Sequence, residues 1–305
     1  MKKFFEELNA LLKPSKRDII EKDFHLHRLL HEIARNENLC KNLCFKGGTC
    51  LIKAYTGYYR FSEDIDFTWM DADIWKDKTK TETKRLCSTE IDNLLEEFKS
   101  LADNLHLDFK GEKRNTSQVH ISSGGRMLLL FLGYYSEILE RPERIKVEIN
   151  FVDKNIYPYQ NKMLQTYVKR IDNEEIRFIY TQLWQDYTTE IQLVCYDPRE
   201  IFTEKCRAAL TRKVYKLRDI IDIYILERDF GYIIHEYKKA IIDKTHFALE
   251  HYKRYQENIE LLEFPTPDIL KNEEMKLMIM PPPEDLSENI VRIHQELHQL
   301  RNELL

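Results

Sequence analysis

The sequence contains no apolar run long enough to cross a bilayer, and it therefore predicts no membrane-spanning segment. Its opening residues, Met1 to Glu7, become acidic too soon for a secretion signal. None of the six cysteines forms a Cys-x-x-Cys pair, and scattered cysteines are typical of reduced thiols in the cytosol. We expect a cytoplasmic protein that has no membrane partner.

The chain also lacks an excess of positive charge, and glycine is scarce. The net charge of −5 excludes a protein that binds nucleic acid over its whole surface, so only a local basic patch would attract a polyanion. Only eight of the 305 residues are glycine, and four of these fall in two pairs, Gly47-Gly48 and Gly124-Gly125. The second pair lies between two strand-like segments and predicts a hairpin turn. The first pair has a different setting.

Two carboxylates follow the first glycine pair at close range. Asp64 and Asp66 alternate with Ile65 and Phe67, which is the pattern of a strand. Residues i and i+2 of a strand point to the same side, so the two carboxylates would project together. They would repel each other unless a cation lay between them. Oxygen ligands of this kind suit Mg²⁺, which binds one or two protein carboxylates together with substrate phosphates.

Gly47 and Gly48 would supply the other half of such a site. They end a short apolar run over 43–45, and a helix-like segment follows from about Thr49. Glycine permits a positive φ and close approach of a ligand, and the first N–H groups of a helix attract anions. Taken alone, a Gly-Gly pair or an Asp-x-Asp pair is commonplace. Together they indicate a phosphate cradle beside a metal site.

The remaining pattern up to residue 195 mixes helices and strands. Apolar spacing predicts helices over 4–13, 16–36 and 82–104, with Ser15 as the cap of the second. Strand patterns cover 106–110, 116–122, 126–135, 143–152 and 191–195. In the segment 143–152, Lys146, Glu148 and Asn150 face one way. Glu148 would be a third acid for a two-metal site if this strand lay beside Asp64 and Asp66. A solvated strand face is the alternative.

From about residue 196 the chain reads as helical to its end, so we place a domain boundary there, between 1–195 and 196–305. Pro198 is typical of a helix start, and Asp219 and Asp222 share a helix face. The last helix, over 285–304, has an apolar stripe that we interpret as an intrachain contact, and this favours a monomer. The densest basic segment in the chain contains Arg207, Arg212, Lys213, Lys216 and Arg218.

Two stretches together resemble a known family. Lys-Gly-Gly-Thr-x-Leu-x-Lys-x-Tyr over 46–55 and Arg-Phe-Ser-Glu-Asp-Ile-Asp-Phe over 60–67 are similar to motifs of the AbiEii/AbiGii-type toxin nucleotidyltransferases, in the DNA polymerase β-like superfamily. The resemblance covers about 20–225 and includes Glu21-Lys22-Asp23. It implies an α/β (α+β) fold, in which a polymerase β-like core with a mixed sheet precedes a helical domain that completes the active site.

The resemblance also implies roles for individual residues. The catalytic residues that it implies are Asp64, Asp66, Glu148, Lys205 and Asp219. The first three of these would bind the metal. The residues implied in nucleotide binding are Lys46, Gly47, Gly48, Thr49, Arg60, Ser62, Lys205, Arg212 and Asp222. Asp222 competes with Asp219 as the acid of the last motif, because the helix can be aligned in either register.

The implied reaction is transfer of NMP from an NTP to an acceptor, with Mg²⁺ or Mn²⁺ and release of pyrophosphate. The acceptor would be RNA, such as the 3′ end of tRNA, or a protein. The chain would then be a toxin with a separate antitoxin protein. Two other functions remain open at this point: a glycosyltransferase that uses the Asp-x-Asp pair, and a non-catalytic module that binds nucleotide or RNA.

Overall fold

A seven-stranded sheet forms the centre of the first part of the chain, with the strand order β3-β4-β5-β2-β1-β7-β6. β2 pairs in parallel with β5, and β1 with β7, whereas the other pairs are antiparallel. The predicted mixed sheet is therefore confirmed. The strands are β1 (Leu43–Lys46), β2 (Asp64–Trp69), β3 (Val119–Ser122), β4 (Met127–Ser136), β5 (Arg141–Asn150), β6 (Gln160–Leu164) and β7 (Ile191–Cys195).

This computed structural model describes residues 1–171, 173–264, 273–279 and 281–305. The chain divides into two compact units. The first unit contains Met1–Asp153 and Tyr159–Cys195, and the second contains Lys154–Pro158 and Tyr196–Leu305. No helix among the described residues combines the length and the apolarity that a membrane span requires.

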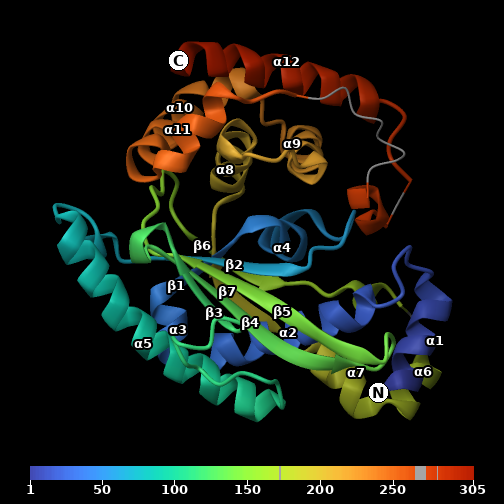
Figure 1. Ribbon diagram of the computed structural model, residues 1–305. Coiled ribbons are helices and arrows are strands. Elements are labelled where there is room, and N and C mark those ends of the chain that lie inside the picture. Colours follow the sequence, from blue (N-terminus) through green and yellow to red (C-terminus); the bar gives the residue numbers. More distant parts are fainter. Residues whose placement is uncertain (172, 265–272, 280) are drawn as a thin grey trace. The chain divides into compact units, whose positions relative to one another are not determined.

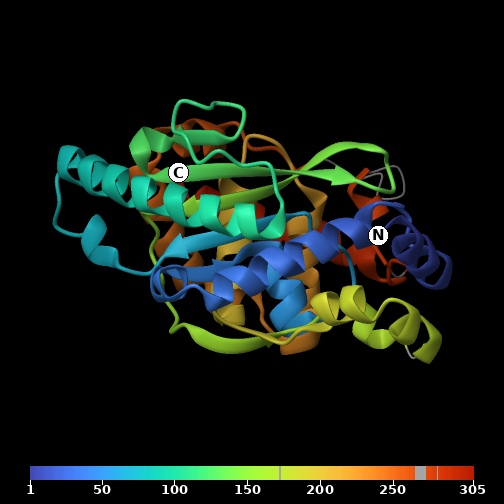
Figure 2. The same ribbon diagram turned by 90° about the horizontal axis from the view of Figure 1, so that it is seen from below.

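Helices cover both faces of the sheet in the first unit. α2, α3 and α5 lie over one face and α4 over the other, and the view from below shows α2 and α5 running across their face (Figures 1 and 2). The α-helices of this unit are α1 (Lys2–Leu12), α2 (Ile19–Arg35), α3 (Glu37–Asn42), α4 (Gly47–Leu51), α5 (Lys80–Leu105), α6 (Glu174–Ile179) and α7 (Thr181–Thr188). A π-helix, η1 (Ile52–Thr56), continues α4, and short 3₁₀ turns are η2 (Ala72–Ile74), η3 (Ser123–Gly125) and η4 (Tyr167–Arg170).

Two local predictions in this unit were wrong. α2 begins at Ile19 with Asp18 as its N-cap residue, not after Ser15, because the chain first makes a turn in which the Ile19 N–H donates to the Lys16 carbonyl. The segment 106–110 forms only an isolated bridge between Asp108 and Gly133. α5 ends at Leu105, and His106, the first residue of this segment, caps the helix with a φ of 57°, which leaves little extended chain.

The second unit is helical. It contains α8 (Pro198–Thr211), α9 (Leu217–Phe230), α10 (Ile234–His251), α11 (Lys253–Glu260), the 3₁₀ turn η6 (Glu273–Leu277) and α12 (Leu286–Leu304). As the sequence predicts, α8 begins with Pro198, and the Asp197 carboxylate accepts the Arg199 N–H. The apolar stripe of α12 is buried within this unit, at Leu286, Ile290, Ile293, Leu297 and Leu300.

Residues 154–158 lie between β5 and β6 in the sequence but pack with the second unit. The buried Glu200 carboxylate accepts the backbone N–H groups of Ile156 and Tyr157, at 2.8 and 2.9 Å. The same carboxylate pairs with the buried Lys244 ammonium, which also donates to the Lys154 carbonyl. The segment that follows the Glu148 strand is thus attached to α8 and α10.

The buried His25 of α2 predicts an acid-sensitive fold. Burial, assisted by Arg28, lowers the pKa of His25 from 6.5 to about 3, so the folded protein keeps this ring neutral. The unfolded chain binds the proton below about pH 6.5, so stability falls as the pH drops from there towards 3. The loss between pH 7 and pH 5 is about 2 kcal/mol. Between pH 7 and pH 5, the free energy of unfolding of His25→Phe, measured with urea, should therefore fall by about 2 kcal/mol less than that of wild type.

The control is His235→Phe, because His235 is exposed, and its free energy of unfolding should change with pH as that of wild type does. An equal change in all three proteins would contradict the prediction.

Candidate active site

Three acids and one lysine meet on one face of the sheet, where β2 and β5 pair in parallel. The register places Asp64 opposite Lys146 and Asp66 opposite Glu148. Alternation along β2 sends Ile65 to the other face, where it is fully buried. The structure therefore brings together Asp64, Asp66 and Glu148, the three residues that the sequence suggested as metal ligands, although Glu148 lies more than 80 residues further along the chain.

The charges of these acids are only partly balanced. Burial, together with the charges of Glu148 and Asp64, raises the pKa of Asp66 to about 7. The Lys146 ammonium lies 3.2 Å from a Glu148 oxygen and 3.6 Å from an Asp64 oxygen. Among the described residues, no three His, Cys, Asp or Glu side chains are arranged as a ready-made metal site. Two of the three acids, Asp64 and Glu148, instead contact the Lys146 ammonium.

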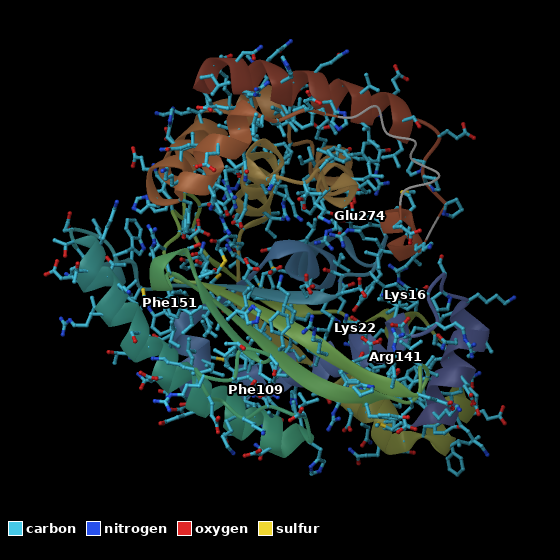
Figure 3. All side chains as sticks on the ribbon, in the orientation of Figure 1. Lys16, Lys22, Phe109, Arg141, Phe151 and Glu274 are labelled. Carbon is cyan, nitrogen blue, oxygen red and sulfur yellow. The ribbon has the colours of Figure 1, made fainter. Side chains whose placement is uncertain are left out.

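Glu63, the acid next to Asp64, does not join this cluster. Its carboxylate pairs with Lys16 at 2.5 Å and with Lys22 at 3.4 Å, two side chains labelled in Figure 3. Burial by itself would raise the pKa of Glu63, but Lys22 and Lys16 lower it. Glu63 is therefore a charged neighbour of the site with a separate set of partners.

The glycine pair lies directly against the acid cluster. α4 begins at Gly47, whose φ of +76° favours glycine, and a Cβ there would overlap the Asp66 carboxylate. A Cβ on Gly48 would lie 2.6 Å from Nη2 of Arg60 and 3.3 Å from Oγ of Ser62. The close approach of the chain to Asp66 thus explains Gly47, and its close approach to Arg60 and Ser62 explains Gly48.

The other residues of the two motifs surround this turn. Thr49 Oγ1 donates to the Asp64 carbonyl and so ties α4 to the start of β2. Lys46, opposite Asp66 on β1, forms a buried ion pair with Asp153 at 2.8 Å. Arg60 is 2% exposed and donates to the Phe61 carbonyl at 2.8 Å. Thr49, Lys46 and Arg60 thus all have partners within the protein, and they support the turn.

A second support was not foreseen from the sequence. Lys53, in the π-helix η1, is 1% exposed and pairs with the buried Asp23 of α2 at 2.8 Å. The hydroxyls of Tyr58 and Tyr187 donate to the same carboxylate, at 2.9 and 2.7 Å. π-Helical turns are rare in proteins, and those that occur are often found at functional sites. In the sequence, the only indications of this ion pair are Lys53 inside the first motif and Asp23 upstream of it.

In the second unit, Lys205 joins α8 to α9. Its ammonium lies 2.8 Å from Asp219 and 2.7 Å from Asp222, and both acids are buried. Arg212 pairs with the other oxygen of Asp219 at 2.9 Å. Burial would raise the pKa of Asp219, but Lys205 and Arg212 outweigh it and lower this pKa. Both acids contact the same lysine, so the structure does not select between Asp219 and Asp222.

The basic segment of the second unit is largely neutralised. Arg207 pairs with Glu204 at 3.4 Å, while Lys216 and Arg218 each lie 3.7 Å from Glu274. Glu274, the shared partner of Lys216 and Arg218, is labelled in Figure 3. Lys213 is exposed, and the side chain of Arg212 is 41% exposed. The positive potential of this segment is therefore smaller than its composition suggests.

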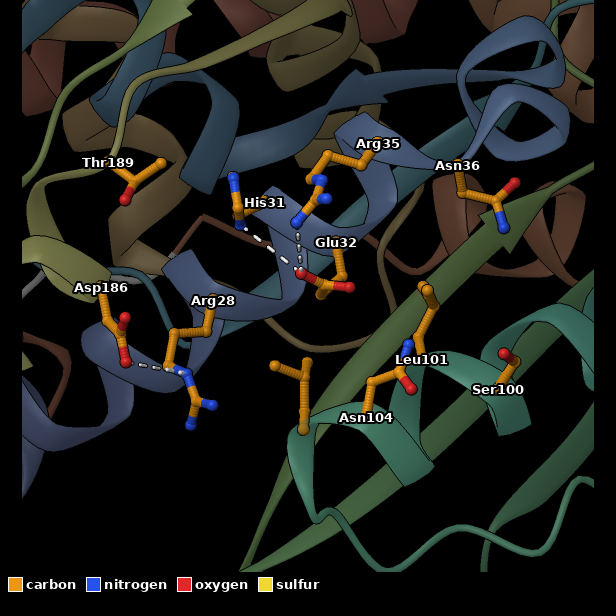
Figure 4. Close-up of a pocket in the computed structure, with 11 residues that line it drawn as sticks. Arg28, His31, Glu32, Arg35, Asn36, Ser100, Leu101, Asn104, Asp186 and Thr189 are labelled. Carbon is orange, nitrogen blue, oxygen red and sulfur yellow. Dashed lines mark ion pairs between the residues drawn. The ribbon is translucent and has the colours of Figure 1, made fainter. Parts of the chain in front are cut away.

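A pocket of about 600 Å³ lies elsewhere in the first unit, between α2, α5 and α7 (Figure 4). Its charged side chains form loose ion pairs within the pocket, such as Arg28 with Asp186 at 4.0 Å and Arg35 with Glu32 at 3.8 Å. The acid cluster does not line it.

A profile of the AbiEii nucleotidyl transferase toxins of type IV toxin–antitoxin systems matches residues 28–292. The chain belongs to this family. The family prediction made from the two motifs is thus confirmed.

Two solved structures from Helicobacter pylori are similar to this AbiEii-family chain. One is described provisionally as a nucleotidyltransferase; it is 16% identical, with a TM-score of 0.45, over 95% of this chain and 97% of its own. The other, JHP933, is also 16% identical, with a TM-score of 0.42, over 93% of this chain and 91% of its own. No curated protein matches the sequence.

The clash at Gly47 predicts an unequal cost for two glycine substitutions. Gly124 has a φ of +69°, but no atom lies within 4 Å of the position that a Cβ would take, so Gly124→Ala should cost only about 1–2 kcal/mol of backbone strain. Gly47→Ala should cost this strain and a further amount of about 1–3 kcal/mol, because the new methyl group displaces Asp66. Urea unfolding measures both, and equal costs would show that Asp66 does not crowd the turn.

The pairing of Lys205 predicts a large stability loss on its removal. Lys205→Met would leave two buried carboxylates without their main cation, which should cost about 3–5 kcal/mol. Arg207→Met, on the same helix, removes a weaker ion pair with Glu204 and should cost roughly 1 kcal/mol. Thermal and urea unfolding compare the two variants, and a mild effect at Lys205 would contradict the described geometry.

Proposed function

We propose that this AbiEii-family chain transfers NMP from an NTP to an RNA acceptor, with Mg²⁺ or Mn²⁺ bound by Asp64, Asp66 and Glu148. The supporting observation is the shared face of β2 and β5, where burial, and after it the charges of Glu148 and Asp64, raise the pKa of Asp66 to about 7. Carboxylates held this close favour a divalent cation, and all-oxygen donors suit magnesium or manganese. The chemistry of the donor set therefore supports the proposed metal, while two of the three carboxylates contact Lys146 in this structure.

The metal, when bound, would polarise the phosphate and activate the acceptor hydroxyl. Residues of the chain would supply the other interactions with the phosphates. The Gly47-Gly48 turn lets the start of α4 lie directly against Asp66 and Arg60, because a side chain on either glycine would overlap one of them, and the first N–H groups of a helix attract phosphate oxygens. Arg60, buried against Gly48, adds a fixed positive charge behind this turn. Such preorganised charge stabilises a phosphoryl group in transfer without reorganisation at the moment of reaction.

RNA, including the 3′ end of tRNA, is the acceptor that we propose. Lys213 is exposed, and Arg212 and Lys216 are partly exposed although each has an acidic partner; phosphate contacts from such cations give salt-dependent binding. We further propose that the chain acts as a toxin controlled by a separate antitoxin protein, in keeping with the type IV family to which it belongs.

The deciding experiment adds each of four α-labelled NTPs, with Mg²⁺, to the protein and total cellular RNA. Wild type should transfer label, and Asp66→Asn should lower transfer by at least about 100-fold, because the metal loses a central charged ligand. Glu63→Gln is the matched control. It removes a neighbouring acid that pairs with Lys16 and Lys22, and it should keep most of the activity.

Other results would support different functions. Full activity of Asp66→Asn would refute the metal assignment. Binding of NTP without transfer to any RNA would indicate a non-catalytic module. Consumption of a nucleotide sugar, with no release of pyrophosphate from NTP, would indicate a glycosyltransferase that uses the Asp-x-Asp pair.

A further inference from the structure

Lys146 occupies an unusual place for a lysine, among the acids of the candidate metal site. Its ammonium lies 3.2 Å from Glu148 and 3.6 Å from Asp64, and about 30% of its side chain is exposed. The backbone sets this position. Alternation along β5 puts residues 146 and 148 on one face, and the parallel register puts Lys146 directly opposite Asp64.

The position of Lys146 conflicts with that of a divalent cation. A metal ion bound by Asp64 and Glu148 would contact the oxygens that now face the ammonium. Two cations that share these oxygens would lie within a few ångströms of each other and repel strongly. The lysine and the metal are therefore alternatives for the same carboxylates.

We propose that Lys146 is a built-in counter-ion, which neutralises Asp64 and Glu148 in the metal-free protein and must move away before a divalent cation binds. This inference rests on the proposed metal site and concerns its affinity. Lys146 would keep the three acids compatible with a folded, metal-free chain, at the expense of metal affinity. The protein would then bind metal weakly in the absence of nucleotide.

The test measures Mn²⁺ affinity of the full-length protein without nucleotide, by titration calorimetry and by electron paramagnetic resonance of free Mn²⁺. Lys146→Met removes the competing charge, so its Mn²⁺ dissociation constant should fall at least about tenfold below that of wild type. Arg144→Met is the matched control. Arg144 lies two residues away on the same strand and face, but its guanidinium stacks on Phe131, 4.4 Å from the ring centre. Its affinity should stay within about twofold of wild type.

Lys146→Gln controls for a folding defect in Lys146→Met, because its amide can still donate hydrogen bonds to the carboxylates without carrying charge. It should also tighten Mn²⁺ binding. Saturating Mg²⁺ should raise the melting temperature of both Lys146 variants more than that of wild type or Arg144→Met. Equal or weaker Mn²⁺ binding by both Lys146 variants would overturn this inference while leaving the metal site in place. If no form of the protein binds Mn²⁺, the proposed metal site fails and this inference fails with it.

Discussion

The parallel pairing of β2 with β5 is the constraint on which the candidate site depends. Its register sets Asp66 beside Glu148 and Asp64 beside Lys146, so that like charges crowd on one face of the sheet. On the other side of β2, antiparallel pairing with β1 sets Lys46 beside Asp66. The chain then turns at the glycine pair into α4. A shift of one residue in either register would move these side chains to the opposite face.

Buried ion pairs fix the elements that carry the site residues. The Asp23–Lys53 pair joins α2 to the π-helix that continues α4, and Lys205 joins α8 to α9 through two acids. Such pairs contribute little net stability, because desolvation offsets most of their Coulomb attraction. Separation of the paired elements would leave a buried charge without its partner, so each pair keeps its two elements in contact. Together with the Thr49 bond to the Asp64 carbonyl, the Asp23–Lys53 pair holds the glycine turn at two points.

The charge distribution also bears on the proposed acceptor. The chain is acidic overall, and most cations of its basic segment already have acidic partners in the second unit. Long-range attraction to RNA would therefore be modest and would fall steeply with salt. Recognition of an acceptor would depend on specific contacts more than on a general positive surface. The proposed transfer to an RNA end would require such specific contacts.

The sequence by itself determined what depends on local spacing. Alternation put Asp64 and Asp66 on one side of a strand, Pro198 marked the start of α8, and the segment 191–195 was recognised as a strand with its observed bounds. The two motifs also identified the family. Tertiary structure decided which distant segments meet: that β5 lies next to β2, that Lys146 stands among the acids, and that Lys53 reaches Asp23. Strand order and burial depend on the packing of the whole chain, and no local period of two or 3.6 residues encodes them.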